Sequence, residues 1–277
     1  MKKILAISGG VDSMCLLHMM RDAPDVVVAH FNHGTRLSAD DDQKFVEEFT
    51  LKYRLPFYTE KANLGANVSE ATAREARYNF LRKLASELDG KIYTAHHLND
   101  LCESIAINLL RGTGWRGLTP FYNAEIEHPM LHFTKSEIYR YASKNQIVFR
   151  QDPTNNEDNY LRNRLRPAVA ELIKTQPDAA KKLDELYSRQ CDLRKEIEQN
   201  LSELFLNNKA YPRNLFKELD DETAEELLRS ILASHSVSVT RPQLRDFLDA
   251  VRTYNSGKKF NLPKDRLVRF NKSYFML

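Results

Sequence analysis

The chain has 277 residues, 42% of them hydrophobic and 29% charged, which fits one large and one small soluble globular domain, and no apolar stretch is long enough to span a membrane. The net charge of +3 is too small to create a global field, so binding to a nucleic acid requires local basic patches. The three cysteines are scattered without Cys-x-x-Cys spacing, which indicates a reducing cytoplasmic setting and argues against a zinc or iron–sulfur site.

The first predicted elements are a short apolar strand at residues 4–7 and a helix that begins after a glycine-rich loop. The loop consists of Ser8, Gly9, Gly10, Val11, Asp12 and Ser13. Backbone N–H groups and the helix dipole favour an anion at such a turn, and glycine lets a phosphate approach the chain. Asp12 or Ser13 can cap the helix, and Asp12 can also hold a metal ion that bridges phosphates. The loop is not a Walker A motif, and its two glycines alone equally fit an ordinary tight turn.

Strands and helices alternate through the first half of the chain. Further strands are predicted at residues 26–29, 55–59 and 91–95, and helices at 39–53 and 69–88, with Ser69 as the cap of the second helix. This alternation predicts an α/β fold with a doubly wound, mostly parallel sheet. Such sheets bind ligands at the carboxyl ends of their strands.

Polar side chains follow three of the predicted strands. The loop 8–13 follows the first strand; the second is followed by His30, Asn32, His33 and Arg36, and the fourth by His96, His97, Asn99 and Asp100. We expect these three groups to converge on one crevice, because they leave the same edge of the sheet. A single histidine near a strand end is nevertheless more often a packed residue than a catalytic one.

Asp100 and Glu103 form a pair of carboxylates on the helix that begins near residue 98. Their spacing of three residues places them on the same side of the helix. Such a pair suits a metal ion or the ammonium group of a cationic substrate. The alternative is that both carboxylates only complement the positive end of the helix dipole.

Arginines and glycines supply further candidates. The stretch from Arg111 to Leu118 contains Gly112, Gly114 and Gly117, and it predicts a loop whose backbone approaches a ligand, or a helix C-cap followed by a long turn. The basic candidates are Arg74 and Arg77 on the helix 69–88, and Arg162, Arg164 and Arg166 around Asn163. Each group can bind phosphates of a substrate or of RNA, or can form ordinary solvated surface charge.

The second half of the chain predicts a long helix at residues 178–206, which either connects two domains or packs on the first. Helices are expected at 221–235 and at 240–254, the latter capped by Thr240, and a hairpin at 260–277. Residues 257–277 contain six basic residues and one acidic residue, which suits RNA binding or a solvated sheet edge. The expected domains are therefore 1–177, a helical connector at 178–208, and a small α+β domain at 209–277.

Seven motifs occur in a fixed order along the first 170 residues. They are Ser8-Gly-Gly-x-Asp-Ser13, His30-x-Asn32-His33-Gly34-x-Arg36, Ala73-Arg74-x-Ala-Arg77-Tyr78, Ala95-His-His-x-x-Asp100-x-x-Glu103, Arg111-Gly-x-Gly114-x-x-Gly117-Leu118, Asp152-x-x-Asn155 and Arg162-Asn163-x-x-Arg166. In this set and order the chain resembles bacterial tRNA(Ile)-lysidine synthetases, which belong to the PP-loop ATP pyrophosphatase superfamily. The region 210–277 looks like the middle, substrate-recognising domain of that family, and the further C-terminal domain of its longer members is not expected here.

The resemblance implies a two-step ligation. ATP adenylates the C2 oxygen of the wobble cytidine in a tRNA(Ile) with a CAU anticodon, with loss of pyrophosphate. The ε-amine of free L-lysine then attacks that carbon, and AMP leaves to give lysidine. The implied cofactors are ATP and Mg²⁺, the implied partners are this tRNA and lysine, no membrane is involved, and a homodimer is possible.

The resemblance also implies roles for single residues. The nucleotide site comprises Ser8, Gly9, Gly10, Val11, Asp12, Ser13, Asn32, His33, Arg36, Arg74 and Gly114. The catalytic residues are Asp100, Glu103 and Arg166; the substrate-binding residues are His97, Arg111, Arg162 and Asn163; and the candidate Mg²⁺ ligands are Asp12 and Asp100.

Two positions depart from the family pattern. Asn99 stands where many members carry a second aspartate, and His128 stands where arginine is usual. The first departure removes a candidate metal ligand, and the second questions a basic role at that position. Two other functions remain to be separated from lysidine synthesis: a PP-loop tRNA thiouridylase, which needs catalytic cysteines or an iron–sulfur cluster, and a non-catalytic tRNA-binding protein.

Overall fold

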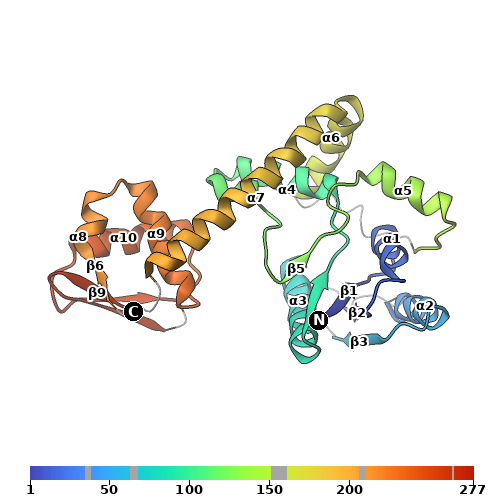
Figure 1. Cartoon of the computed structure of the whole chain (residues 1–277), viewed down its shortest axis with the longest axis horizontal. Coiled ribbons are helices and arrows are strands. Elements are labelled where there is room, and N and C mark those ends of the chain that lie inside the picture. Colours follow the sequence, from blue (N-terminus) through green and yellow to red (C-terminus); the bar gives the residue numbers. More distant parts are fainter. Residues whose placement is uncertain (35–38, 63–67, 151–160, 206–209, 264) are drawn as a thin grey trace. The chain divides into compact units, whose positions relative to one another are not determined.

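The computed structural model describes residues 1–34, 39–62, 68–150, 161–205, 210–263 and 265–277. The chain divides into two compact units, Met1–Cys191 and Asp192–Leu277 (Figure 1). Arg36 and the motif Asp152-x-x-Asn155 lie outside the described residues. No helix among the described residues is long and apolar enough to cross a bilayer.

The first unit is built on a five-stranded sheet. Its strands are β1 (Lys2–Ala6), β2 (Val26–Asn32), β3 (Phe57–Lys61), β4 (Gly90–Tyr93) and β5 (Ile126–Glu127). They are ordered β3-β2-β1-β4-β5, and every neighbouring pair is parallel. The predicted parallel sheet is confirmed, and the order places the three strands with polar exits side by side. The two-residue strand β5 was not predicted, because so short a stretch carries no periodicity.

Helices cover both faces of this sheet. The helices of the first unit are α1 (Val11–Met20), α2 (Ala39–Lys52), α3 (Glu70–Glu87), α4 (Leu98–Leu110), α5 (Lys135–Lys144), α6 (Leu161–Thr175) and the first part of α7 (Pro177–Phe205), with a short 3-10 helix at Trp115–Leu118. Leu5 packs with residues of α1 and α5, whereas its neighbour Ile4 packs with residues of α3. Adjacent side chains of a strand point to opposite faces, so the doubly wound arrangement follows from this apolar strand.

The helix α4 packs against α6 and the first part of α7 in a separate hydrophobic cluster. Leu101 and Ile105 of α4 lie in this cluster with Val169 of α6 and Tyr187 of α7. The buried side of α4 therefore holds α6 next to the carboxyl end of the sheet. The boundary between the two units falls within α7, and a separate connector at 178–208 stays a prediction.

The second unit combines helices with a small antiparallel sheet. Its elements are β6 (Tyr211–Pro212), α8 (Arg213–Glu218), α9 (Asp221–Ser234), α10 (Arg241–Thr253), β7 (Lys259–Leu262), β8 (Arg266–Phe270) and β9 (Tyr274–Met276). The strand order is β6-β9-β8-β7. The expected hairpin is thus a three-stranded meander joined by β6. As predicted, Thr240 caps its helix by accepting a hydrogen bond from the N–H of Gln243.

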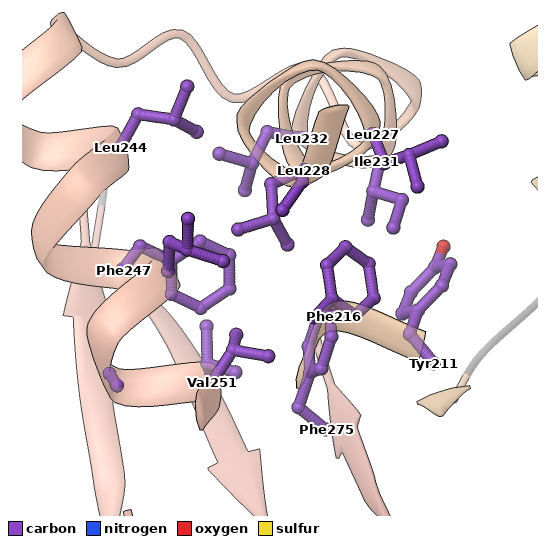
Figure 2. Close-up of a cluster of buried hydrophobic side chains, with 14 of the residues drawn as sticks. Tyr211, Phe216, Leu227, Leu228, Ile231, Leu232, Leu244, Phe247, Val251 and Phe275 are labelled. Atoms are coloured by element: carbon purple, nitrogen blue, oxygen red, sulfur yellow. The ribbon is translucent and has the colours of Figure 1, made fainter. Parts of the chain in front are cut away.

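Aromatic side chains fill the core of the second unit (Figure 2). The rings of Phe216 and Phe247 each lie 5.6 Å from the ring of Phe275, in edge-to-face geometry. Such pairs add stabilisation beyond the area that they bury. The core thus joins α8, α10 and β9 independently of the first unit.

Arg213 is a buried cation that binds backbone oxygens in the second unit. It donates to the carbonyls of Val251 at 2.6 Å, Tyr254 at 2.6 Å and Asn271 at 2.8 Å. These contacts satisfy the carbonyls at the end of α10 and in the turn before β9. Arg213 is therefore part of the fold and not of the basic surface.

Candidate active site

The loop between β1 and α1 is closed by Ser13. Its Oγ accepts hydrogen bonds from the N–H groups of Ser8 and Gly9, each at 3.2 Å, and donates to the carbonyl of Gly10 at 2.9 Å. Gly9 has φ +92°, a conformation that favours glycine. The prediction that Asp12 or Ser13 caps α1 is wrong: Gly10 is the N-cap and makes no side-chain cap bond.

The N-terminus of α1 is the part of this loop suited to an anion. The first α-helical bond joins the N–H of Met14 to Gly10, so helix geometry leaves the N–H groups of Val11, Asp12 and Ser13 without intrahelical acceptors. Together with the helix dipole, these groups fit a phosphate. The anion site predicted from the loop is therefore compatible with its geometry, although two loop N–H groups are taken by Ser13.

Asp12 meets a lysine that the sequence did not single out. The Nζ of Lys135 donates to both carboxylate oxygens of Asp12, at 2.6 and 2.7 Å. The Nε2 of His97 lies 3.8 Å from Oδ1 of the same carboxylate. Lys135 begins α5, 123 residues after Asp12, and its local sequence only signals a helix start.

His97 and Asp100 form a reciprocal cap at the start of α4. Asp100 Oδ2 accepts from the backbone N–H of His97 at 3.0 Å, and His97 Nδ1 accepts from the N–H of Asp100 at 3.4 Å. Burial lowers the pKa of His97, although Asp100 and Asp12 act in the opposite direction, so the ring is neutral at pH 7. Because Nδ1 accepts a hydrogen bond, the proton lies on Nε2, which faces Asp12.

Asp100 remains ionised at neutral pH. Burial acts to raise the pKa of its carboxyl group, but the neighbouring histidines and the backbone N–H of His97 outweigh burial and lower this pKa below the usual value. The capping bond uses Oδ2, which leaves Oδ1 for a ligand. Asp100 is thus a charged group held rigidly at the carboxyl end of β4.

Glu103 pairs with two arginines of α6. Its carboxylate is 2% exposed and lies 3.2 Å from Nε of Arg162 and 3.6 Å from Nε of Arg166. Burial, reinforced by the charge of Asp100, raises the pKa of Glu103, although both arginines counteract this. Arg162 also donates to Ser104 at 3.0 Å. The two carboxylates predicted to share one ligand therefore have different partners: Asp100 caps α4, and Glu103 holds α6.

Two histidines, His96 after β4 and His128 after β5, form a neutral cluster. Thr94 Oγ1 lies 2.8 Å from Nδ1 of His96 and 2.7 Å from Nδ1 of His128, and both rings pack against Phe121. Burial lowers the pKa of His96 to about 3 and the pKa of His128 to about 4. His128, the position where arginine is usual, is therefore a neutral partner of His96.

Asn32, at the end of β2, is bound mostly to residues of α2. Asn32 is 1% exposed, and its amide donates to Asp40 at 2.8 Å and Gln43 at 3.1 Å while its oxygen accepts from the N–H of Gly34. His33 packs edge-on against Phe31. Asn32 thus shapes the entry to α2, and its contact with a nucleotide stays a prediction.

Other predicted residues lie apart from Asp100. Arg111 follows α4, and a rise of about 1.5 Å per residue places it about 16 Å along the helix from Asp100. Gly114 lies beyond it in the next loop, where an added Cβ would have no atom within 4 Å. Gly117 must be glycine for packing, since a Cβ would lie 2.0 Å from Thr113 Oγ1. Arg74 is exposed on α3, with its guanidinium 5.0 Å from the Tyr78 ring centre.

The loop also has a main-chain partner that the sequence did not indicate. The N–H of Arg150 donates to the carbonyl of Gly9 at 2.9 Å, and its guanidinium lies 3.7 Å from Asp42 on α2. The hydrogen bond from Arg150 helps to hold Gly9 in its positive-φ conformation, although Arg150 lies far from the loop in sequence. Any residue other than proline can donate its backbone N–H to a carbonyl, so this hydrogen bond requires no particular residue type and could not be predicted from the sequence.

The described residues contain no group of three His, Cys, Asp or Glu side chains arranged to hold a metal ion. Asp12 offers carboxylate oxygens beside the anion site, and Lys135 already places a cation on them. Mg²⁺ commonly takes one or two carboxylates and completes its shell with water and substrate phosphates. Asp12 fits that pattern, whereas Asp100 is committed on one oxygen to its cap.

Comparison with solved structures supports the fold. A U34-tRNA thiolase, NcsA, from Methanococcus maripaludis aligns with a TM-score of 0.59 at 16% identity, covering 69% of this chain and 72% of the thiolase. At this identity the likeness shows the α/β fold and no more.

Comparison with curated proteins finds tRNA(Ile)-lysidine synthases. The enzyme of Clostridium tetani is 38% identical over 182 residues, covering 60% of this chain and 39% of the relative. The bifunctional protein TilS/HprT of Listeria monocytogenes is 27% identical over 304 residues, covering 99% of this chain and 46% of the relative. The chain thus spans less than half the length of these two relatives. The resemblance drawn from the seven motifs is confirmed.

A family model places these motifs in one domain. The model of the PP-loop domain matches residues 1–173, a range that contains the loop 8–13, the carboxylates of α4 and the arginines of α6. The match covers more than half of the chain, so the protein belongs to the PP-loop family.

Proposed function

We propose that the protein ligates L-lysine to C2 of the wobble cytidine of a tRNA(Ile) with a CAU anticodon, consuming ATP and releasing pyrophosphate and AMP. The observation that carries this proposal is the 3.8 Å distance between His97 and Asp12, which lies beside the anion site. His97 is the N-cap of α4 and pairs with Asp100 in a capping box. This contact places the N-terminus of α1, which suits a phosphate, near the carboxylate of Asp100, which suits the ammonium group of lysine. The names of the curated relatives support the same reaction.

The first step is adenylation of the base. The C2 oxygen of cytidine attacks the α-phosphorus of ATP, a new P–O bond forms, and the bond to the β-phosphate breaks to release pyrophosphate. The N–H groups of Val11, Asp12 and Ser13 are the groups that would stabilise the negative charge of the departing pyrophosphate. Asp12 would hold Mg²⁺, which supplies charge neutralisation of the phosphates.

The second step replaces AMP by lysine. The ε-amine attacks C2, the C–O bond to AMP breaks, and the attacking nitrogen loses a proton. We assign Asp100 to the lysine side chain, because its ionised Oδ1 is available beside a fixed cap. An attacking amine must be neutral, so the ammonium form that this carboxylate binds must lose its proton to water before attack, because a carboxylate with a lowered pKa is too weak a base to hold that proton.

The arginines of α6 would bind an anionic group of a substrate. Glu103 fixes one side of Arg162 and Arg166 and leaves further guanidinium N–H groups in the fork of each side chain. These suit the α-carboxylate of lysine or a phosphate of the tRNA. Glu103 would therefore act in catalysis by positioning these arginines. Roles for Arg74, Arg111, Gly114 and Asn163 stay predictions.

The second unit would bind tRNA. Its sheet region carries exposed basic side chains: Lys258, Lys259, Arg266, Arg269 and Lys272. Phosphates of RNA are the natural partners of such a group. A cytoplasmic location and a homodimer belong to the same proposal.

Transfer of labelled lysine tests the proposed reaction. The full chain is incubated with ATP, Mg²⁺ and an unmodified tRNA(Ile) transcript with the CAU anticodon. The matched control is the same transcript with uridine in place of the wobble cytidine. We expect label only in the cytidine transcript; equal labelling of both, or of neither, contradicts the proposal.

A further inference from the structure

We propose that Lys135 is a phosphate-binding residue of this site, whose ammonium group moves from the Asp12 carboxylate, where it lies in this structure, to a phosphate oxygen of ATP. The inference rests on the proposed use of ATP, but not on the identity of the nucleophile or of the tRNA. It adds to the anion site a residue that lies 123 positions from the loop.

The backbone of Lys135 is fixed to the start of α4. Its N–H donates to Oδ1 of Asn99 at 2.9 Å, and the N–H of Leu98 donates to the carbonyl of Phe133 at 2.9 Å. Thr134 caps α5 by accepting from the N–H of Glu137. The backbone of Lys135 is therefore fixed against α4, the helix that carries Asp100, whichever group the ammonium contacts. Asn99, which departs from the family pattern, contributes one of these anchors.

The side chain of Lys135, in contrast, is free to change partners. It is 32% exposed and Asp12 is 31% exposed, so water reaches both members of the pair. Ion pairs at such exposure are weak, because solvent screens them and a long side chain loses freedom. A lysine also has three N–H donors on a flexible stem, so it can exchange or share an acceptor without movement of α5.

The charges favour such an exchange. A carboxylate on the first turn of α1 repels the phosphates that the helix terminus attracts, and Lys135 neutralises it. A triphosphate carries more negative charge than one carboxylate and offers more oxygen acceptors, so it competes for the ammonium group. Asp12 would also hold a divalent cation if one binds with the phosphates, and such a cation would compete with Lys135 for the carboxylate.

The alternative is that Lys135 serves only as a permanent counter-ion for Asp12. Both functions would place its ammonium at 2.6 Å from the carboxylate, so the distance alone does not separate them. If Lys135 binds a phosphate, a neutral residue at position 135 weakens ATP binding, and a neutral residue at position 12 does not restore the affinity. If Lys135 is only a counter-ion, a neutral residue at position 12 restores it.

Calorimetric titration of the full chain with ATP and with adenosine, in Mg²⁺ buffer and without tRNA or lysine, tests the proposal. Lys135→Met keeps the length of the side chain and removes its charge; Lys144→Met, at the other end of α5, is the matched control. We expect Lys135→Met to weaken ATP binding at least about tenfold, with adenosine binding unchanged. Lys135→Arg should restore most of the loss, and Lys144→Met should bind ATP as the wild type does.

Unchanged ATP affinity in Lys135→Met overturns the proposal. So does recovery of wild-type affinity when Asp12→Asn is added to Lys135→Met, because Lys135 would then act only as a counter-ion. Thermal melting of each variant shows whether the fold is retained. A wild type that binds ATP but transfers no lysine would refute the proposed reaction and leave the Lys135 assignment intact, whereas a wild type that does not bind ATP refutes both.

Discussion

The buried carboxylate of Glu103 lies 3.2 Å from the guanidinium Nε of Arg162. The pair joins α4 to α6, and its members differ in exposure: Glu103 is almost fully buried, whereas the arginine is partly exposed. Removing one member is therefore not equivalent to removing the other, because only the arginine can recover hydration.

This asymmetry predicts the order of stability losses. Replacing both Arg162 and Arg166 by Met leaves the carboxylate of Glu103 buried without a cation and should cost about 3 kcal/mol of unfolding free energy. Glu103→Gln leaves two partly exposed arginines and should cost about 1 kcal/mol. Urea unfolding followed by the fluorescence of Trp115, the only tryptophan, reports on the first unit. Equal losses of unfolding free energy in the two variants would show that the deeper burial of Glu103 does not determine the cost of breaking the pair.

Asp100→Asn separates the charge of this residue from its capping role. An asparagine oxygen can still accept the N–H of His97, so the free energy of unfolding should change by less than about 1 kcal/mol. Turnover in lysine transfer should fall at least about 100-fold, since the side chain no longer carries a charge. Steady-state kinetics and urea unfolding of the same preparation check both parts. A near-normal turnover removes Asp100 from the site.

The neutral state of His96 and His128 predicts that the folded protein loses stability in acid. Burial lowers the pKa of His96 to about 3 and that of His128 to about 4, whereas both groups in the unfolded chain titrate near pH 6.5. Between these values the unfolded state binds more protons than the folded state, so stability falls as the pH falls. The contribution of these two groups is fully present above pH 6.5 and is lost progressively towards pH 4.

His128→Gln tests this coupling. Glutamine does not titrate, so the loss of unfolding free energy between pH 6.5 and pH 4 should shrink by at least about 1.4 kcal/mol, the equivalent of one pKa unit. Urea unfolding at both pH values measures it in the wild type and in the variant. An identical loss in the two proteins would mean that His128 is protonated in the folded state.

The cysteines distinguish lysidine synthesis from thiouridylation. Cys15 and Cys102 are buried, and burial raises the pKa of each thiol to about 11, which disfavours a reactive thiolate. Cys102→Ala combined with Cys191→Ala should therefore retain lysine transfer within about twofold of the wild type. Loss of all transfer in a variant that melts normally would instead favour cysteine chemistry.

The sequence predicted the framework of the first unit well. The apolar strands at 4–7 and 26–29 differ from β1 and β2 only at their ends, and Ser69 caps α3 as expected by accepting from the N–H of Thr72. These elements are specified by local patterns of apolar residues and caps. The short strand β5 depends on pairing with β4, and the Thr134–Glu137 capping box marks the start of α5 without indicating that Lys135 contacts Asp12.

The sequence motifs nominated the residues of the candidate site but indicated only some of the contacts that these residues make. The loop stands out because Ser-Gly-Gly-x-Asp-Ser is rare as a whole, and Asp100 stands out because it accompanies two histidines after β4. The pairing of Asp12 with Lys135 and the arginine partners of Glu103 arise from tertiary packing, which residue spacing does not encode. Arg111 and Gly114 lie beyond the far end of α4 because the helix continues to Leu110, a separation that follows from residue spacing once the helix is known.

The most direct test of the central claim is AMP formation from ATP with the unmodified CAU-anticodon tRNA(Ile) transcript, with labelled lysine present and absent. The account predicts AMP and labelled tRNA in equal amounts when lysine is present, and neither product with a transcript that lacks the wobble cytidine. AMP formation without transfer of lysine to the tRNA would contradict the proposed second step, and no AMP under any of these conditions would contradict the proposed reaction as a whole.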